Sequence, residues 1–249
     1  MSALKAIAMI PARYAATRFP QKLMKMLGDK TVIRSTYENT VATELFSEVY
    51  VVTDHPLIYD EITRHGGKAL MSKREHESGT DRIAEAVEHI DADVILNVQG
   101  DEPFVSATPL AALLSVFEQP DTRVASLMKP FQDVEIAHNP NVVKVVVDSN
   151  FQSLMFSRSP IPYHRDHTLP VTYYEHIGVY AFTKEALMTF TQLKPTALEL
   201  IEKIECLRFL ENGIPLKMVT TEVAMLKIDV PDDLEKAIDH LNKINQLKR

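Results

Sequence analysis

Two carboxylates follow an apolar run at residues 94–98, and their types and spacing are well suited to chemistry. Asp101 comes after Gly100, which lets the backbone turn, and Pro103 prevents the strand from continuing. An acid at the carboxyl end of a buried strand is costly unless it holds a cation or a substrate. A hard divalent metal that bridges the phosphates of a nucleotide is the natural occupant of such a place.

Three cations lie within ten positions after the first apolar run: Arg13, Arg18 and Lys22. Fixed cations suit a triphosphate, because charge-assisted bonds to phosphate are strong. A solvated basic loop is an equally good interpretation of three cations alone. The sequence has neither the G-x-G-x-x-G fingerprint of a dinucleotide site nor a G-x-x-x-x-G-K-[ST] loop, which argues against a dehydrogenase and a P-loop enzyme.

Two further segments carry polar groups at expected helix starts. Ser78 and Thr80 precede or open a helix, where an N-terminus favours an anion, although such residues often serve only as caps. Asp229 stands before a proline that opens the last helix. We interpret Glu102, Asp232 and Asp233 as capping or surface groups.

The second half of the sequence places arginines next to aromatic and histidine residues. Arg158 follows Phe156-Ser157, Arg165 follows His164, and His176 lies four positions before Tyr180. This mixture suits an anionic, hydroxyl-rich ligand such as a sugar acid. The alternative is that His176 is a satisfied core histidine and Tyr180 an ordinary strand residue.

Composition limits the class of protein. The 249 residues are 45% hydrophobic and 24% charged, which is typical of a globular chain with a sizeable core. The formal charge of −7 and the lack of a long basic run argue against nucleic acid and an anionic membrane as partners. The apolar run at residues 6–10 is too short for a signal sequence or a membrane span, and Cys206 is the single cysteine. We therefore expect a cytoplasmic protein.

Strands and helices alternate in the first half of the chain. The apolar patterns predict strands near residues 6–10, 49–53, 68–71 and 94–98, and helices near 32–43, 56–65, 79–89 and 108–118. This order predicts βαβ units and a largely parallel, doubly wound sheet. The polar motifs after the strands should then meet at the carboxyl edge of the sheet, although they are far apart in sequence.

The second half is richer in expected strands. The patterns predict strands near residues 123–128, 142–147, 153–156, 173–182 and 216–219, with a turn at 148–150 and a long loop from 160 to 170. Helices are expected at 184–191, at 197–212 closed by Gly213, and from 231 to about 246. We predict one α/β domain over residues 1–249, with an inserted β-rich lobe at roughly 130–195.

Together these segments resemble the 3-deoxy-manno-octulosonate (Kdo) cytidylyltransferase family, whose members are also called CMP-Kdo synthetases. The shared motifs keep their order and spacing from the first strand to the last helix: P-A-R-Y-A-x-T-R-x-P-x-K, V-x-T-D-H, H-x-S-G-T-[DE]-R, N-V-Q-G-D-E-P, F-S-R-x-x-I-P, H-[IL]-G-[IV]-Y and a late D-x-P-[ED]-D-L-E. The combination of the first and fourth motifs is specific, whereas each tripeptide alone would be weak.

The resemblance implies a Rossmann-like nucleotide-diphospho-sugar transferase fold with an inserted lobe for dimerisation and sugar binding, a homodimer, and CMP transfer from CTP to Kdo for lipopolysaccharide biosynthesis. It implies that Asp101 and Asp229 hold a catalytic Mg²⁺, and that Arg13 and Lys22 act on the triphosphate. The implied nucleotide contacts are Ala12, Arg13, Thr17, Arg18, Lys22, Ser78, Thr80, Gln99 and Asp101. The implied sugar contacts are Gln99, Arg158, Arg165, His176, Tyr180 and Glu205.

The chain departs from the family pattern at several positions. Gln21 replaces a usual glycine in the first motif, and Cys206 replaces an amide beside Glu205. The alternatives are therefore a cytidylyltransferase for 8-amino-Kdo or sialic acid, and a nucleotide-binding protein without catalytic activity. An uncovered strand edge in the second half is a reasonable place for the dimer contact.

Overall fold

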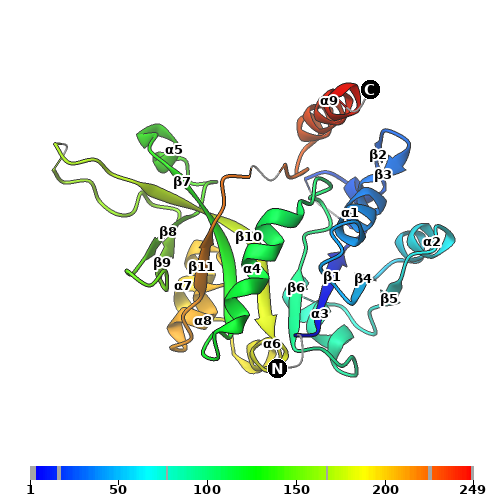
Figure 1. Ribbon diagram of the computed structural model, residues 1–249, viewed down its shortest axis with the longest axis horizontal. Coiled ribbons are helices and arrows are strands. Elements are labelled where there is room, and N and C mark those ends of the chain that lie inside the picture. The colour runs from blue at the N-terminus through cyan, green and yellow to red at the C-terminus, as the bar shows by residue number, and fades with distance from the viewer. Residues whose placement is uncertain (1–3, 16–17, 77, 167, 224–225, 248–249) are drawn as a thin grey trace. The chain divides into compact units, whose positions relative to one another are not determined.

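The structure is a computed structural model that describes residues 4–15, 18–76, 78–166, 168–223 and 226–247. The chain forms two compact units, coloured along the sequence in Figure 1. The first unit comprises Met1–Thr108 and Ala224–Arg249, and the second comprises Pro109–Val223. The insertion expected at 130–195 falls inside the second unit, and a single domain over the whole chain stays a prediction.

The first unit is built on a four-stranded parallel sheet. Its strands are β1 (Ala6–Ala12), β4 (Glu48–Thr53), β5 (Ala69–Met71) and β6 (Val94–Asn97). Strand β1 pairs with β6 on one side and with β4 on the other, and β4 pairs with β5. Every residue of β6 is buried, as expected for a mostly apolar strand that is covered on both faces.

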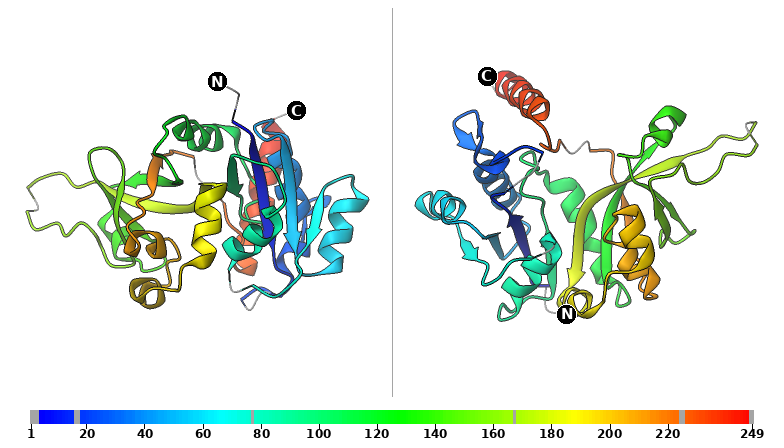
Figure 2. Two further views of the ribbon diagram at one scale, coloured as in Figure 1. Left: turned by 90° about the horizontal axis from the view of Figure 1, so that it is seen from below. Right: turned by 180° about the vertical axis from the view of Figure 1, so that it is seen from behind.

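Three helices connect these strands. They are α1 (Val32–Val41), α2 (Pro56–Arg64) and α3 (Gly79–Val87), and each packs against the sheet. The chain moves from β1 to β4 and β5, then returns to β6. Because such crossovers are right-handed, α3 covers the opposite face from α1 and α2 (Figure 2). The direction of the strand order therefore reverses beside β1, and such a reversal is where open parallel sheets bind ligands.

The first unit is completed by short elements and by the last helix. These are the 3₁₀ helix η1 (Lys22–Met24), the hairpin of β2 (Met26–Leu27) and β3 (Lys30–Thr31), and α9 (Pro231–Leu247). Helix α9 packs on β2, and the ring of His240 meets Phe104 edge-on. Two distant parts of the sequence thus belong to one unit.

The second unit is a mixed sheet. Strand β7 (Val124–Phe131) pairs antiparallel with β10 (Tyr173–Thr183) and parallel with β11 (Lys217–Thr220). Strands β8 (Lys144–Val147) and β9 (Ser153–Ser157) form an antiparallel hairpin, and β8 also pairs with β10. The expected turn is present, because Asp148 accepts backbone hydrogen bonds at Oδ1 from Asn150 and Gln152.

Helices flank the strands of the second unit. The unit contains α4 (Ala107–Ser115, which begins at the boundary), the 3₁₀ helix η2 (Val116–Glu118), α5 (Val134–His138), α6 (Lys184–Gln192), α7 (Ala197–Glu202) and α8 (Leu207–Glu211). The single helix expected over 197–212 is wrong. Lys203 adopts a left-handed conformation with φ of 54°, which ends α7 before α8 begins.

The predicted fold class is confirmed: an α/β structure with a mostly parallel sheet in the first unit and a β-rich second unit. The predicted elements of the first half are present within a few residues of their expected ends. None of the helices in the described part of the chain has the length and hydrophobicity of a membrane-spanning segment.

Candidate active site

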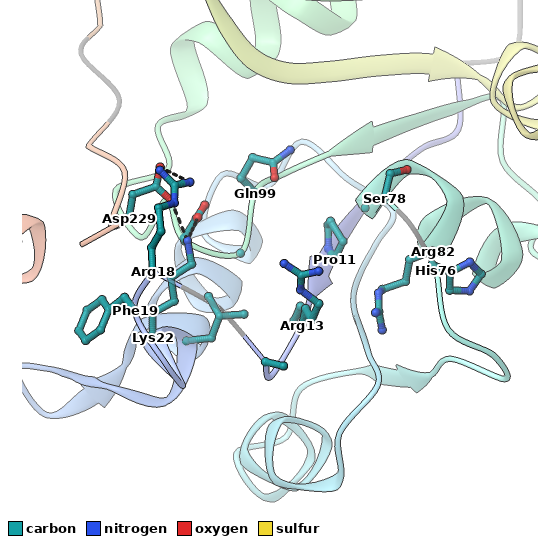
Figure 3. Close-up of a pocket in the computed structure, with 16 residues that line it drawn as sticks. Pro11, Arg13, Arg18, Phe19, Lys22, His76, Ser78, Arg82, Gln99 and Asp229 are labelled. Carbon is teal, nitrogen blue, oxygen red and sulfur yellow. Dashed lines mark hydrogen bonds and ion pairs between the residues drawn. The ribbon is translucent and has the colours of Figure 1, made fainter. Parts of the chain in front are cut away.

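A pocket of about 270 Å³ opens at the carboxyl edge of the parallel sheet in the first unit. Its walls come from the loop after β1, the start of α3, the loop after β6 and the segment before α9. Figure 3 shows Arg13 between the group of Arg18, Lys22 and Asp229 and the group of Ser78 and Arg82. The pocket thus gathers motifs that are far apart in sequence at the place where a parallel sheet binds ligands.

One ammonium group joins the two predicted acid residues. Lys22 Nζ donates to Asp101 Oδ2 at 2.5 Å and to Asp229 Oδ1 at 2.9 Å (Figure 3). The side chain of Lys22 is 16% exposed and that of Asp101 is 11% exposed. Since both carboxylates lie within hydrogen-bond reach of one nitrogen, they face a common point.

The backbone fixes this convergence. Ile228, which is fully buried, donates its N–H to the carbonyl oxygen of Asp101 at 3.0 Å. Gly100 packs so closely that a Cβ there would lie 3.0 Å from the carbonyl oxygen of Pro11, and Thr36 Oγ1 donates to the Gly100 carbonyl at 2.9 Å. A side chain at position 100 would therefore have to displace the Pro11 carbonyl slightly, which favours glycine in the turn that carries Asp101.

Asp229 is surrounded by positive charge. Arg18 Nη2 lies 3.5 Å and Lys227 Nζ 3.3 Å from its Oδ2. Partial burial raises the pKa of Asp229, but the hydrogen bond from Lys22 and the charges of Lys227, Lys22 and Arg18 outweigh it and hold the pKa below its usual value. Asp229 is consequently ionised at neutral pH and available as an anionic ligand.

The expectation that Glu102 is a capping or surface group is wrong. The residue is only 6% exposed, and its Oε2 finds no hydrogen-bond partner among the described residues. Burial raises the pKa of Glu102 to about 8, and the neighbouring charge of Asp101 contributes to the rise. Asp233 does act as a cap, because its Oδ2 accepts from the N–H groups of Asp229 and Val230.

Most of the predicted nucleotide contacts line the pocket. Those that do so are Ala12, Arg13, Arg18, Lys22, Ser78, Gln99 and Asp101. Ser78 also caps α3, since its Oγ accepts from Asp81 N at 3.1 Å. Thr80 is buried and is not part of the pocket wall, and Thr17 lies outside the described residues. Their roles as ligand contacts stay predictions.

Sequence reasoning missed two polar side chains of the pocket wall, His76 and Arg82. His76 Nε2 lies 2.9 Å from Glu85 Oε2, and Arg82 Nη2 donates to Asp54 Oδ2 at 2.9 Å. Both belong to the H-x-S-G-T-[DE]-R motif. The position of this motif at the start of a helix could have identified them as pocket residues.

The predicted sugar contacts all belong to the second unit except Gln99. His176 on β10 donates through Nε2 to Ser126 Oγ at 3.0 Å, with the tautomer assigned because the Ser126 hydroxyl donates to the backbone carbonyls of Ile177 and Val179. Burial lowers the pKa of His176 to about 4, so its ring is neutral at pH 7.

Tyr180 lies near His176 and the thiol of Cys206. Its ring centroid is 5.4 Å from that of His176, and its hydroxyl is hydrogen bonded to Cys206. Burial is the main reason that the pKa of Tyr180 is raised. The structure therefore brings together His176, Tyr180 and the position next to Glu205.

The two predicted arginines differ in setting. Arg158 directs its guanidinium to three backbone carbonyls, those of Glu202, Pro140 and Lys203. Arg165 lies on the exposed loop between β9 and β10. Arg158 thus braces the chain around α7, and a role of either side chain in sugar binding stays a prediction.

A doubly wound parallel sheet with cations and paired acids at its carboxyl edge is typical of a nucleotide-binding enzyme such as a nucleotidyltransferase. The family model described as cytidylyltransferase matches residues 7–244. Two curated relatives named 3-deoxy-manno-octulosonate cytidylyltransferase are similar over most of their length. The relative from Christiangramia forsetii is 57% identical and covers 93% of this chain and 94% of its own, and that from Flavobacterium johnsoniae is 55% identical and covers 94% and 97%.

A solved structure agrees with these relatives. A CMP:2-keto-3-deoxy-manno-octonic acid synthetase complexed with CTP superposes with a TM-score of 0.91 at 35% identity, covering 96% of this chain and 99% of that chain. The chain therefore belongs to the cytidylyltransferase family, among the 3-deoxy-manno-octulosonate cytidylyltransferases. The resemblance predicted from the sequence is confirmed.

Proposed function

We propose that this chain transfers CMP from CTP to the anomeric hydroxyl of Kdo, giving CMP-Kdo and pyrophosphate for lipopolysaccharide biosynthesis. The observation that carries the proposal is the convergence of Asp101 and Asp229 on Lys22 in a pocket that Arg13 and Arg18 also line. The names of the curated relatives and of the CTP-bound neighbour support the choice of substrates.

The chain's own residues account for the charge that such a transfer must control. The anomeric oxygen forms a bond to the α-phosphorus, the bond to the β-phosphate oxygen breaks, and pyrophosphate leaves with the electron pair. Lys22 and Arg13 pair with the triphosphate and stabilise the charge that accumulates on the leaving pyrophosphate. Positioning and charge neutralisation supply most of the rate in this kind of reaction.

The acid pair fits a divalent cation. Asp101 Oδ1 is buried and finds no hydrogen-bond partner among the described residues, while its Oδ2 and Asp229 Oδ1 face one cationic point. No group of three acid, histidine or cysteine side chains among these residues is placed to hold a metal, so phosphate and water oxygens would complete the coordination. We infer that Asp101 and Asp229 hold Mg²⁺, which when bound neutralises phosphate charge and lowers the pKa of the attacking hydroxyl.

We assign the sugar acid mainly to residues of the second unit. His176 and Tyr180 supply a neutral ring and a hydroxyl, and Gln99, Glu205, Arg158 and Arg165 complete the proposed set. Because Cys206 is held inward by Tyr180, it offers the ligand less polarity than an amide would. A neutral His176 that carries its proton on Nε2 can accept one hydrogen bond at Nδ1 without adding charge.

We also propose a homodimer formed through the second unit. Large apolar side chains are exposed there: Leu154 on β9 is 61% exposed, Ile201 on α7 is 78% exposed and Leu169 is 62% exposed. Exposed apolar side chains beside a strand edge favour association. Light scattering during size exclusion checks this, and a monomer at micromolar concentration contradicts it.

We place the protein in the cytoplasm, where its lone Cys206 needs no disulfide partner.

The test is pyrophosphate release by the full chain with CTP, Mg²⁺ and Kdo, compared with 8-amino-Kdo and sialic acid. We expect release with Kdo and CTP, and little with ATP, GTP or UTP. Faster release with 8-amino-Kdo or sialic acid would transfer the assignment to that sugar acid. CTP binding without release for every sugar acid would instead identify a nucleotide-binding protein that lacks catalytic activity.

A further inference from the structure

The loop that carries Arg13 is anchored by a network that spans three strand ends. Strands β1 and β4 run parallel with Ala12 opposite Thr53, so Tyr14 and Asp54 leave the sheet side by side. Asp54 Oδ1 accepts the backbone N–H of Tyr14 at 3.1 Å. This bond lies one residue beyond Arg13, at the point where the cationic loop leaves β1.

The second oxygen of Asp54 is fixed by α3. Arg82 Nη2 donates to Asp54 Oδ2 at 2.9 Å, and Arg82 Nη1 donates to Ser72 Oγ at 2.8 Å, just beyond β5. The Arg82 side chain is 4% exposed and that of Asp54 is 32% exposed. One buried guanidinium therefore ties the ends of β4 and β5 to the helix whose first residues line the pocket.

The ring of His55 holds the side chain of Tyr14, whose backbone is bonded to Asp54. It stacks on the Tyr14 ring at a centroid distance of 3.7 Å and an interplanar angle of 8°. His55 Nδ1 accepts from Leu57 N at 3.2 Å, which caps α2 and fixes the orientation of the imidazole. Tyr14 is thus held twice, through its backbone by Asp54 and through its ring by His55.

We propose that Asp54, Arg82 and His55 are positioning residues that hold the Tyr14 backbone, and through it Arg13, in the geometry that CTP requires. This inference rests on the proposed function, because Arg13 acts there on the triphosphate. A carboxylate bonded at both oxygens cannot rotate, so it transmits the position of α3 to the loop. Displacement of a phosphate-binding group by about 1 Å can cost about a hundredfold in rate.

Four variants separate an effect of the network on CTP use from an effect on the stability of the fold. Asp54→Ala removes both bonds, whereas Asp54→Asn keeps an oxygen for Tyr14 N–H and loses the charge opposite Arg82. His55→Asn removes the stacked ring but retains a good helix cap, so α2 is preserved. Asp60→Ala is the matched control, because Asp60 forms an Arg–Asp pair with Arg64 at 3.1 Å on the same unit but outside the pocket.

Steady-state kinetics and calorimetric CTP binding measure the effect, with thermal melts beside them. For Asp54→Ala we expect kcat/KM for CTP to fall about ten- to a hundredfold, with the KM for Kdo unchanged. Asp54→Asn and His55→Asn should each show a smaller fall in kcat/KM for CTP, and Asp60→Ala should have the same kcat/KM as the unaltered chain. A purely structural role would instead lower the melting temperature and change both substrate constants together.

The outcomes distinguish this inference from the proposed function. If the unaltered chain releases no pyrophosphate, the proposed function fails, and the ratio of CTP affinities between the unaltered chain and Asp54→Ala still tests the network. If the unaltered chain is active but Asp54→Ala keeps kcat/KM for CTP within about twofold, the inference is overturned. Should Asp54→Ala fail to fold, an unchanged CTP affinity and turnover in His55→Asn would overturn it as well.

Discussion

The ammonium nitrogen of Lys22 lies 2.5 Å from a carboxylate oxygen of Asp101, although the two residues are 79 positions apart in sequence. The same nitrogen bonds Asp229, which is 207 positions away. These contacts turn three separate motifs into one cluster of alternating charge. Substitution at any member is therefore expected to affect the cluster as a unit.

Neutralising either acid should abolish most of the activity. For Asp101→Asn and Asp229→Asn we expect kcat to fall at least about a hundredfold, because the charge-stabilising group is lost while the shape is kept. Pyrophosphate release at saturating Mg²⁺ measures this, and circular dichroism checks the fold. Asp232→Asn is the control, since Asp232 is exposed close to Asp229. Near-normal turnover of either acid variant would reject its assignment.

The cations of the first loop should differ in importance. Lys22→Met removes a hydrogen-bonded, mostly buried ammonium, whereas Arg18 is 70% exposed and lies 3.5 Å from Asp229. We expect Lys22→Met to lower kcat/KM for CTP about a hundredfold and Arg18→Met to lower it about tenfold or less, because exposed pairs are screened by salt. Kinetics at low and high ionic strength measure both effects.

The control for these cation variants is Lys25→Met, which removes a nearby exposed lysine outside the pocket wall. Equal losses for Lys25→Met and Lys22→Met would show that net charge, not the specific contact, controls CTP use.

The sequence could predict the sheet because its strands are short apolar runs that end in polar motifs. The run at 94–97 and its acids identified the carboxyl edge without any structure. The pairing of Asp101 with Asp229 could not come from periodicity, because α9 returns to the first unit only after the whole second unit. Resemblance supplied that pairing.

Other features were missed for identifiable physical reasons. Neither Gly nor Pro marks the end of α7, so residue propensities do not predict the left-handed conformation of Lys203. Glu102 is buried beside Asp101, whose backbone carbonyl accepts from the distant Ile228, and no local sequence pattern reports such a long-range contact. The roles of Asp54 and Arg82 depend on strand register, which fixes which loop residues become neighbours.

Glu102 should make the stability of the protein depend on pH. Burial raises its pKa to about 8 in the folded state, above the ordinary value of 4.5 for a glutamate. Between these values the folded chain keeps a proton that the unfolded chain releases, so the free energy of unfolding falls as pH rises through this window. The slope approaches about 1.4 kcal/mol per pH unit as an upper limit.

Urea unfolding with a metal chelator, from pH about 5 to about 9, checks this expectation. Glu102→Gln should remove the slope, so that its stability advantage over the unaltered chain grows with pH up to about 8 and then levels off. Glu235→Gln, at an exposed position on α9, serves as the control and should follow the unaltered chain. Parallel curves for the unaltered chain and Glu102→Gln would contradict the burial of an ionisable carboxyl at this position.

Cys206 should be inert while the protein is folded. Its side chain is buried at 1% exposure, and burial raises the pKa of the thiol, although the hydrogen bond from Tyr180 opposes part of that rise. The thiolate is the reactive form, so both access and ionisation are reduced. Because it is the only cysteine, alkylation by iodoacetamide followed by mass spectrometry reports this one site.

We expect alkylation at pH about 8 to be at least about a hundredfold slower in the native protein than in urea. Tyr180→Phe removes the hydrogen bond that favours the thiolate, so any residual native reactivity should fall further. The urea-unfolded chain is the internal control, since its thiol reacts at the rate of a free cysteine. Similar rates with and without urea would show that Cys206 faces solvent, and would make it available as a direct contact for the sugar acid.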